Sequence, residues 1–211
     1  MFSFSFFSRR TFPALGGLPL LAATLLLALL PAAPAQAALL STGACNEAAL
    51  TQPFAHWGDS NYYELVSQGN FEGSLSEWTL TGGAHQAPEG EPYDVAGEVG
   101  HDSLALPAGA TVQSPFTCVN ASYPSFRFFA RQRGLLATLL VQVVYKTALG
   151  PLTASLGVVA LSGSWQPTLP MLTDSIVGGV LSGGTGQVAL RFTALLGESR
   201  IDDIYIDPRM R

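Results

Sequence analysis

Aromatic side chains are the residues of this chain best suited to contact a ligand. Trp57, Tyr62, Tyr63, Tyr93 and Trp165 lie in or beside irregular segments that are rich in Gly and Pro. An exposed aromatic ring stacks on the apolar C–H face of a sugar, while nearby polar side chains bind its hydroxyl groups. These five residues are therefore candidate carbohydrate contacts. The alternative for Trp165 is a buried loop anchor, and for Trp57, Tyr62 and Tyr63 it is an N-terminal arm that packs over the domain.

No catalytic residues are predicted, because no motif of a familiar catalytic centre occurs in the sequence. The three histidines, His56, His85 and His101, are scattered and form neither an HExxH nor an HxH pattern. This distribution disfavours a zinc site. No G-x-S-x-G elbow, P-loop or dinucleotide-binding glycine motif is present either, which disfavours the corresponding hydrolases and nucleotide-binding enzymes.

A group of carboxylates leaves one enzymatic alternative open. Glu89, Glu91, Asp94 and Glu98 lie in a Pro/Gly-rich loop, and Asp102 follows just beyond it. A glycosidase requires two carboxyl groups held roughly 5–9.5 Å apart, which a sequence does not reveal. We expect a solvated acidic loop here and keep an unrecognised hydrolase as the third hypothesis for function.

The N-terminus has the pattern of a secretory signal peptide. Arg9 and Arg10 precede a Leu/Ala-rich run over residues 14–33, and Ala35-Gln36-Ala37 follows as an A-x-A cleavage site. We therefore predict a signal peptide over residues 1–37, with a membrane anchor as the alternative. The paired arginines fit the twin-arginine route, whereas the apolar run fits the Sec route, and the choice stays open. The expected product is secreted or extracytoplasmic and has no stable membrane span.

The cleaved product would be acidic and held by one disulfide. It retains 174 residues with eight basic and 15 acidic side chains, a net charge of −7, which does not suit a nucleic-acid partner. Cys45 and Cys118 are the two cysteines, and an exported chain with two cysteines most simply forms one disulfide. The loop between them is long enough for a stabilisation of about 4 kcal/mol in the chain-entropy model.

The elements expected to position these residues are short β-strands. Alternating or β-branched apolar stretches separated by Gly and Pro are typical of strands and turns, and no amphipathic helix of three turns is evident. We expect an N-terminal arm over residues 38–61 and an all-β domain, an antiparallel β-sandwich or jelly roll, over residues 62–211. Strands are predicted at 62–66, 78–81, 103–106, 111–114, 125–131, 135–145, 154–161, 188–195 and 199–206.

Two motifs at the ends of this domain resemble those of a known group of proteins. The segment Leu65–Thr79 contains Asn70-Phe71-Glu72 followed by Trp78, and Ile201–Ile206 contains an Asp-Asp pair between apolar residues. Together they resemble the opening and closing segments of galactose-binding-like jelly rolls, such as carbohydrate-binding modules. The chain as a whole also resembles a group of uncharacterised exported bacterial proteins.

The resemblance implies a structural calcium ion, the only cofactor expected. The corresponding ligands would be Glu72 and either Asp202 or Asp203, since only one of two adjacent residues on a regular strand faces inward. Calcium takes six to eight oxygen ligands, and carboxylates are supplemented by carbonyl groups and water. The alternative is that Glu72 caps a turn and that the Asp pair accepts hydrogen bonds from the backbone or from Arg200.

These observations lead to two main hypotheses. The first is an exported, non-catalytic domain that binds carbohydrate or another cell-envelope component. The second is a cell-surface structural or protein-interaction domain without a small-molecule ligand. Arg127, Arg131 and Arg133 form the main basic group; they either lie on a solvated sheet face or bind an acidic sugar.

Overall fold

The regular secondary structure of the described residues is almost entirely β-strand. A computed structural model describes residues 49–95, 97, 99–120, 125–173 and 185–207, which belong to one compact unit, Ala38–Arg211. It contains eleven strands and one 3-10 helix, η1 (Ala55–Trp57), and these residues include no α-helix. Among them, no helix could span a membrane. The all-β prediction is confirmed, whereas the predicted signal peptide, residues 1–37, lies outside the described residues.

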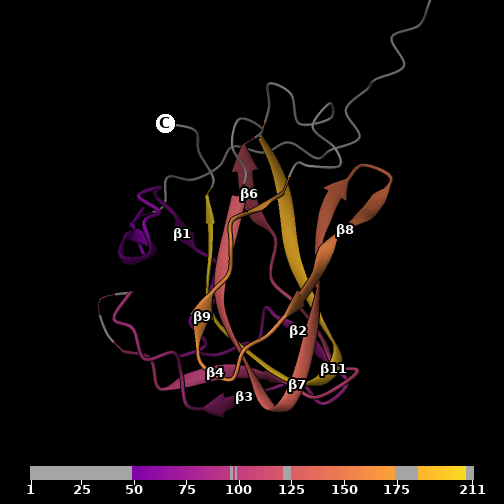
Figure 1. Cartoon of the computed structure of the whole chain (residues 1–211). Helices are drawn as coiled ribbons and strands as arrows, with labels where there is room; N and C mark the ends of the chain where they lie inside the picture. Colours follow the sequence, from indigo (N-terminus) through magenta and orange to yellow (C-terminus); the bar gives the residue numbers. More distant parts are fainter. Residues whose placement is uncertain (1–48, 96, 98, 121–124, 174–184, 208–211) are drawn as a thin grey trace, which may run out of the picture. The chain divides into compact units, whose positions relative to one another are not determined.

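Two long strands organise the whole sheet. β7 (Ser125–Thr147) and β11 (Thr185–Asp207) pair antiparallel from Val188↔Tyr145 to Asp207↔Ser125 and bend together near one end of the domain (Figure 1). The register shifts at the bend, where Gly197 has φ +64° and a Cβ atom would meet the carbonyl oxygen of Leu136 at 1.9 Å. Glycine is therefore required there, because a side chain has no space and the backbone is left-handed.

The bend divides the eleven strands into two layers. The first layer combines the first half of β7 and the second half of β11 with five shorter strands. These are β1 (Glu64–Leu65), β3 (His85–Pro88), β4 (Asp102–Leu106), β9 (Gln166–Pro167) and β10 (Met171–Leu172). The second layer combines the other halves of the long strands with β2, β5, β6 and β8. Their bounds are Thr79–Thr81, Thr111–Gln113, Thr117–Asn120 and Gly150–Ala160.

The main hydrophobic core lies between these layers. Phe128 of the first layer meets Phe192 of the second edge to face, with ring centroids 4.9 Å apart, and both rings are fully buried. Val141, Val143, Leu190 and their alternating neighbours complete the core from the second layer. The architecture is thus the predicted antiparallel β-sandwich, in which alternate residues of each strand point inward.

A second apolar cluster covers the outer side of the first layer. Phe129 and Tyr205 point away from the main core and pack with Phe54, Tyr63 and Trp165. Phe54 belongs to the N-terminal arm, and its ring stacks on Phe129 at 5.6 Å. A backbone bridge between Thr51 and Tyr63 ties the described end of the arm to the domain. The first layer is therefore buried on both faces.

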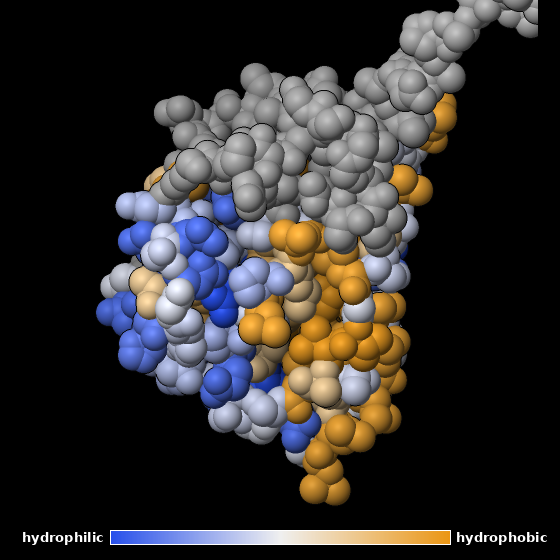
Figure 2. Space-filling view, turned by 45° about the horizontal axis from the view of Figure 1, so that its top comes forward, coloured by the Kyte–Doolittle hydropathy of each residue, from blue (hydrophilic) through white to orange (hydrophobic). Residues whose placement is uncertain are grey.

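One side of the sandwich remains apolar at its surface. Figure 2 shows hydrophobic side chains gathered along the β8 side and toward the bend. Leu152 and Val158 of β8 are 48% and 57% exposed, and Leu172 of β10 is 50% exposed. The groove between β8 and β10 has a volume of about 370 Å³. The other exposed apolar residues at this side and at the bend are Leu135, Leu136, Leu149, Leu169, Leu195 and Leu196.

The strands differ from the sequence-based expectation in their continuity. The stretches 125–131 and 135–145 form the single strand β7, and 188–195 and 199–206 form β11, because the chain bends without leaving the sheet. The short strands β3, β6, β9 and β10 were not predicted, since two to four residues carry too little periodicity. Cys118 lies on β6, whereas Cys45 lies outside the described residues, so the disulfide stays a prediction.

Candidate functional site

Two of the predicted aromatic contacts meet in one hollow on the outer side of the first layer. Trp57 closes η1, and Tyr93 comes from the loop that follows β3; their rings pack edge to face at 4.9 Å. Both rings also contact Phe129 beneath them, at 5.2 and 5.6 Å. The buried side chain of Phe129 thus holds together two rings from segments 36 positions apart in the sequence.

Polar side chains surround this aromatic pair. The hollow, called here the aromatic pocket, has a volume of about 370 Å³ and is lined by Gln52, Pro53, His56, Trp57, Tyr93, Asp94 and Val95. Its amide, imidazole and carboxylate groups can exchange hydrogen bonds with hydroxyl groups, and its rings offer an apolar surface. A concave site with an apolar wall and a few polar groups has the general character of a small-molecule site.

Local backbone geometry sets the two walls of the aromatic pocket. The first wall ends where Gly58 adopts φ 79° and donates its N–H to the carbonyl of Ala55, which closes η1 directly after Trp57. In the second wall, the Tyr93 hydroxyl donates to the carbonyl oxygen of Trp165 at 3.1 Å, and the Tyr93 N–H donates to Glu91 Oε2 at 2.6 Å. Tyr93 is therefore held at both its backbone and its hydroxyl group.

The other predicted ligand contacts do not line the aromatic pocket. Trp165 is 5% exposed and Tyr63 is fully buried, so both support the outer cluster of the first layer and neither offers a stacking face. The expectation that they contact a ligand directly is corrected, because the arm and loops cover them. Tyr62 is 39% exposed but is not among the residues that line the aromatic pocket.

The predicted opening and closing motifs lie beside each other, as expected. Glu72 Oε1 accepts the backbone N–H groups of His101 and Asp102 at 2.7 and 2.8 Å. A Cβ atom on Gly100 would lie 2.9 Å from this oxygen and 4.0 Å from Asp202 Oδ2, so the two carboxylate oxygens are at most 6.9 Å apart, the sum of those distances. Glu72 thus caps a turn, which was the alternative considered for it.

Both residues of the Asp pair are buried, although a regular strand would turn only one of them inward. Asp202 is 1% and Asp203 is 5% exposed. β11 changes register between Asp202 and Tyr205, and Asp203 adopts φ 45°. This local irregularity brings both carboxyl groups to the same side as Glu91, whose side chain hydrogen-bonds to Asp203. Asp202 Oδ2 also accepts the Glu91 N–H at 2.7 Å.

The electrostatics of these carboxyl groups are unusual for acidic side chains. Burial, reinforced by the negative charge of Asp203, raises the pKa of Asp202 to about 9. Burial also raises the pKa values of Glu91 and Asp203, which share a hydrogen bond, and Glu72 adds to the effect at Asp203. Glu91 Oε1 is buried and has no hydrogen-bond partner among the described residues. Glu72, Glu91, Asp202 and Asp203 are called here the carboxylate cluster.

The carboxylate cluster does not have an evident metal-ligand arrangement. Within the described residues, no three His, Cys, Asp or Glu side chains are placed so that they could hold a metal ion. The cluster nevertheless joins the aromatic pocket through one loop, because Glu91 accepts the N–H of Tyr93. A group that neutralises these carboxyls, a proton or a cation, therefore also affects the loop that carries Tyr93.

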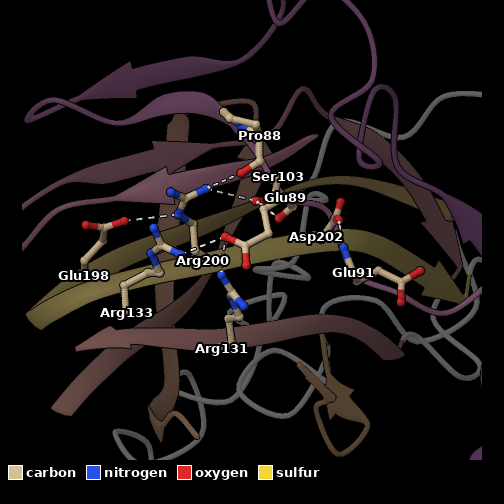
Figure 3. A network of polar contacts seen from close by, with 9 residues as sticks. All are labelled: Pro88, Glu89, Glu91, Ser103, Arg131, Arg133, Glu198, Arg200 and Asp202. Atoms are coloured by element: carbon tan, nitrogen blue, oxygen red, sulfur yellow. Dashed lines mark hydrogen bonds and ion pairs between the residues drawn. The ribbon is translucent and has the colours of Figure 1, made fainter. Parts of the chain in front are cut away.

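Two arginines of the group predicted to lie on a solvated sheet face or to bind an acidic sugar, Arg131 and Arg133, pair with one carboxylate of the loop after β3, and Arg133 is 48% exposed. Figure 3 shows Arg131 and Arg133 directed at Glu89, and each makes an ion pair of 2.7 Å with Glu89 Oε2. In the same network, Arg200 pairs with Glu198 at 3.1 Å and donates to the carbonyl oxygen of Pro88 at 3.2 Å. The loop after β3 is thus fixed just before it reaches the carboxylate cluster and the aromatic pocket.

Arg127 has a separate role. It is 5% exposed, pairs with Asp59 at 2.8 Å and donates its Nε–H to the carbonyl oxygen of Thr168 at 2.7 Å. Burial alone would raise the pKa of Asp59, but hydrogen bonds from Arg127 and Tyr63 hold it below the ordinary value. This buried pair anchors the segment after η1, and with it the first wall of the aromatic pocket.

Several residues of the aromatic pocket were not predicted as ligand contacts. Gln52 and His56 lie in the arm, and Asp94 lies in the segment for which the sequence predicts a solvated acidic loop. Neither segment has the periodicity that would show which residues face each other. The sequence offers one indication that Gln52 and His56 lie in the same pocket as Trp57, namely that they are close to it along the chain. A short helical turn places such neighbouring side chains around one hollow.

Comparisons with known proteins agree with this architecture at the level of the fold. No protein-family model and no curated protein matches the sequence. The solved structures similar to it are mainly β-sandwich carbohydrate-binding modules. One is the CBM22-2 xylan-binding domain of Paenibacillus barcinonensis Xyn10C, with 12% identity over 67% of this chain and 98% of that one and a TM-score of 0.46. Another is TmCBM61 in complex with β-1,4-galactotriose, with 13% identity, 69% and 98% coverage and a TM-score of 0.43.

Two further similar structures are parts of enzymes. The enzymatically active domain of bacteriophage CBA120 tailspike protein 4 is 19% identical, with a TM-score of 0.48. The chain covers 21% of that protein and 29% of the Clostridium thermocellum xylanase modules that it also resembles. The predicted likeness to carbohydrate-binding modules is therefore confirmed, and at these identities and TM-scores it carries neither a ligand nor an activity to this chain.

Proposed function

We propose that this protein is an exported, non-catalytic carbohydrate-binding domain and that its ligand lies in the aromatic pocket. The observation that carries the proposal is the pairing of Trp57 with Tyr93 at the wall of a hollow whose rim holds Gln52, His56 and Asp94. The rings would contact the C–H face of a sugar, and the three polar side chains would bind its hydroxyl groups.

A glycan array followed by titration calorimetry tests this proposal. The purified protein should bind a neutral oligosaccharide, and Trp57→Ala and Asp94→Ala should each weaken that binding at least about tenfold. Phe116→Ala is the matched control, because Phe116 is 38% exposed and lies outside the aromatic pocket. Melting curves show whether the variants remain folded. Failure to bind any glycan, or equal binding by all variants, would contradict the proposal.

We further propose that calcium neutralises the carboxylate cluster. Glu72 and either Asp202 or Asp203 would supply carboxylate oxygens, with carbonyl groups and water completing the shell. The buried, unpartnered Oε1 of Glu91 supports this, because a buried carboxylate oxygen without a partner is costly. Calcium there would supply charge neutralisation only. Elemental analysis of the purified protein and melting with and without a chelator test the proposal; no bound metal and no shift would contradict it.

A second candidate function is protein association through the β8 edge, with a second copy of this chain as the partner. Among the described residues β8 pairs only with β7, and its other backbone edge has no strand partner among them. No charged residue occurs from Thr147 to Thr173, so two such edges can meet without charge repulsion (Figure 2). Light scattering should then show a dimer that Val158→Lys dissociates. A monomer at all concentrations would contradict this second function.

A further inference from the structure

A row of polar side chains crosses the outer face of the second layer. Thr79, Gln113, Arg191, Gln142 and Ser155 are successive register partners on β2, β5, β11, β7 and β8. All five side chains are at least partly exposed. A row across five strands spans about 19 Å, because neighbouring strands lie about 4.8 Å apart. This polar row has the extent of a linear binding surface.

Hydrogen bonds keep the polar row in place. Arg191 donates from Nε and Nη2 to Gln113 Oε1, at 3.0 and 2.7 Å. Gln142 donates from Nε2 to Ser155 Oγ at 3.0 Å. These bonds orient the guanidinium group of Arg191 along the sheet. Donors and acceptors are therefore pre-oriented at the surface, which lowers the entropic cost of binding.

The row beside it adds hydroxyl groups and apolar surface. Thr81, Thr111, Thr193, Leu140 and Val158 are register partners on the same five strands. The hydroxyl groups of Thr111 and Thr193 share a hydrogen bond of 2.9 Å. Val158 is 57% exposed and offers apolar contact next to the hydroxyl groups. Polar and apolar groups in parallel rows suit a ligand that carries both hydroxyl groups and C–H faces.

The second layer also differs in charge from the rest of the chain. The strands β2, β5 and β8, with residues 137–147 of β7 and 185–196 of β11, contain two basic residues, Lys146 and Arg191, and no Asp or Glu. The whole sequence has 15 acidic and 10 basic residues. Because the second layer reverses the sign of the whole chain, it favours an anionic ligand over a neutral or cationic one.

We infer that the outer face of the second layer binds a glycan chain that carries carboxylates, such as a polyuronate. Arg191 forms a charge-assisted hydrogen bond with a carboxylate, and Gln113, Gln142 and Ser155 bind the hydroxyl groups of neighbouring sugars. This surface is distinct from the aromatic pocket, which lies on the outer side of the first layer. The inference therefore does not depend on the ligand proposed for that pocket.

Affinity electrophoresis in gels that contain polygalacturonate tests the inference, with neutral galactan as the comparison polymer. Polygalacturonate should retard the wild-type protein at low salt, and added salt should reduce the effect. Arg191→Gln should weaken binding at least about tenfold, as expected for the loss of a hydrogen bond between charged groups. Arg133→Gln removes an equal charge from an exposed site in the first layer, where it pairs with Glu89, and should leave binding unchanged.

Three outcomes would overturn the inference. They are no retardation by polygalacturonate, equal retardation of the wild type and Arg191→Gln, or an equal loss in Arg191→Gln and Arg133→Gln, which would indicate unspecific attraction. Gln142→Ala should also weaken binding and provides a second test should Arg191→Gln prove unstable. Trp57→Ala should retain polygalacturonate binding. The proposal for this surface and the proposal for the aromatic pocket can therefore be rejected independently.

Discussion

The two layers of the sandwich use polar side chains in opposite ways. The first layer buries the charged or ionisable side chains of Arg127, Arg200, Asp202 and Asp203. Both arginines are neutralised by ion pairs within the protein. The second layer carries no acidic residue on its strands and presents its polar groups outward. A buried charge destabilises a protein unless an opposite charge or hydrogen-bonding group lies beside it. The positions of the polar side chains in the first layer are therefore tightly constrained. The second layer is held by apolar packing, and its outer polar residues are free to vary.

This difference explains where each candidate site lies. The aromatic pocket is built from loops and the N-terminal arm, and such segments need anchors. Arg127 with Asp59 anchors one wall, and Glu91 beneath Tyr93 anchors the other. The polar row of the second layer needs no such anchors, because the strand register itself aligns its residues. A substitution that removes one of these anchors should therefore lower the free energy of unfolding. A substitution in the polar row should change it little.

Loss of Arg127 should have the largest effect. Arg127→Met should lower the free energy of unfolding by about 3–5 kcal/mol, because it leaves the carboxylate of Asp59, whose side chain is only 12% exposed, without its cation. Chemical denaturation measures the change. Arg133→Met is the control: Arg133 is 48% exposed, so its ion pair should contribute less than about 1 kcal/mol. Equal losses in the two variants would mean that the buried pair is not an anchor.

The bend between the layers should be the next most sensitive feature. Gly197→Ala should cost about 2–4 kcal/mol, since Ala adds both left-handed strain and a clash with the carbonyl of Leu136. Gly134, near the same bend on β7, has φ 92°, but no atom lies within 4 Å of the place that a methyl group would take. Gly134→Ala should therefore cost only about 1 kcal/mol, from the backbone strain alone. A similar loss at both glycines, measured by thermal unfolding, would contradict the steric explanation.

The sequence allowed the fold to be predicted further than the sites. Alternation in segments such as Val188–Leu195 identified strands, and the motifs around Glu72 and Asp202 correctly placed the two ends of the domain together. The bend was missed because Gly197 looks like a turn residue in sequence, whereas it keeps β11 within both layers. A local pattern gives no information on whether a chain leaves the sheet.

The binding residues were harder to predict for a different reason. Trp57 and Trp165 both lie in irregular segments, yet Trp57 lines the aromatic pocket and Trp165 is buried in the second apolar cluster. The exposure of each tryptophan depends on how the arm crosses the first layer. The packing of Phe54 on Phe129, which are far apart in sequence, sets the position of the arm. The polar row was missed because Gln113, Gln142 and Arg191 are ordinary surface residues until the register aligns them.

The carboxylate cluster should make the stability of the metal-free first layer depend on pH. The pKa of Asp202 is raised from 3.8 to about 9, so the folded state binds a proton that the unfolded chain releases. Its contribution to stability is complete below about pH 4 and is lost as the pH rises toward 9. With a chelator present, the melting temperature should fall by on the order of 5 °C between pH 5 and pH 8.5.

Two further measurements sharpen that result. Added calcium should flatten the pH dependence, because the cation replaces the proton as the neutralising charge. Asp202→Asn should flatten it without calcium, whereas Glu77→Gln, which removes an exposed carboxylate outside the cluster, should leave it as in the wild type. If the melting temperature in chelator does not fall with rising pH, then ionisation of the cluster does not destabilise the folded state.

The polar row should give the smallest effect, and this makes it the sharpest test of the contrast between the layers. Gln142→Val removes the hydrogen bond to Ser155 from a half-buried position on the outer face of the second layer. Valine suits a β-strand, so the free energy of unfolding should change by no more than about 0.5 kcal/mol. Chemical denaturation of this variant beside Arg127→Met measures both extremes. A loss of unfolding free energy above about 1 kcal/mol would mean that the polar row stabilises the fold. An unchanged free energy would mean that the row is not needed for folding, as expected for a ligand-binding surface.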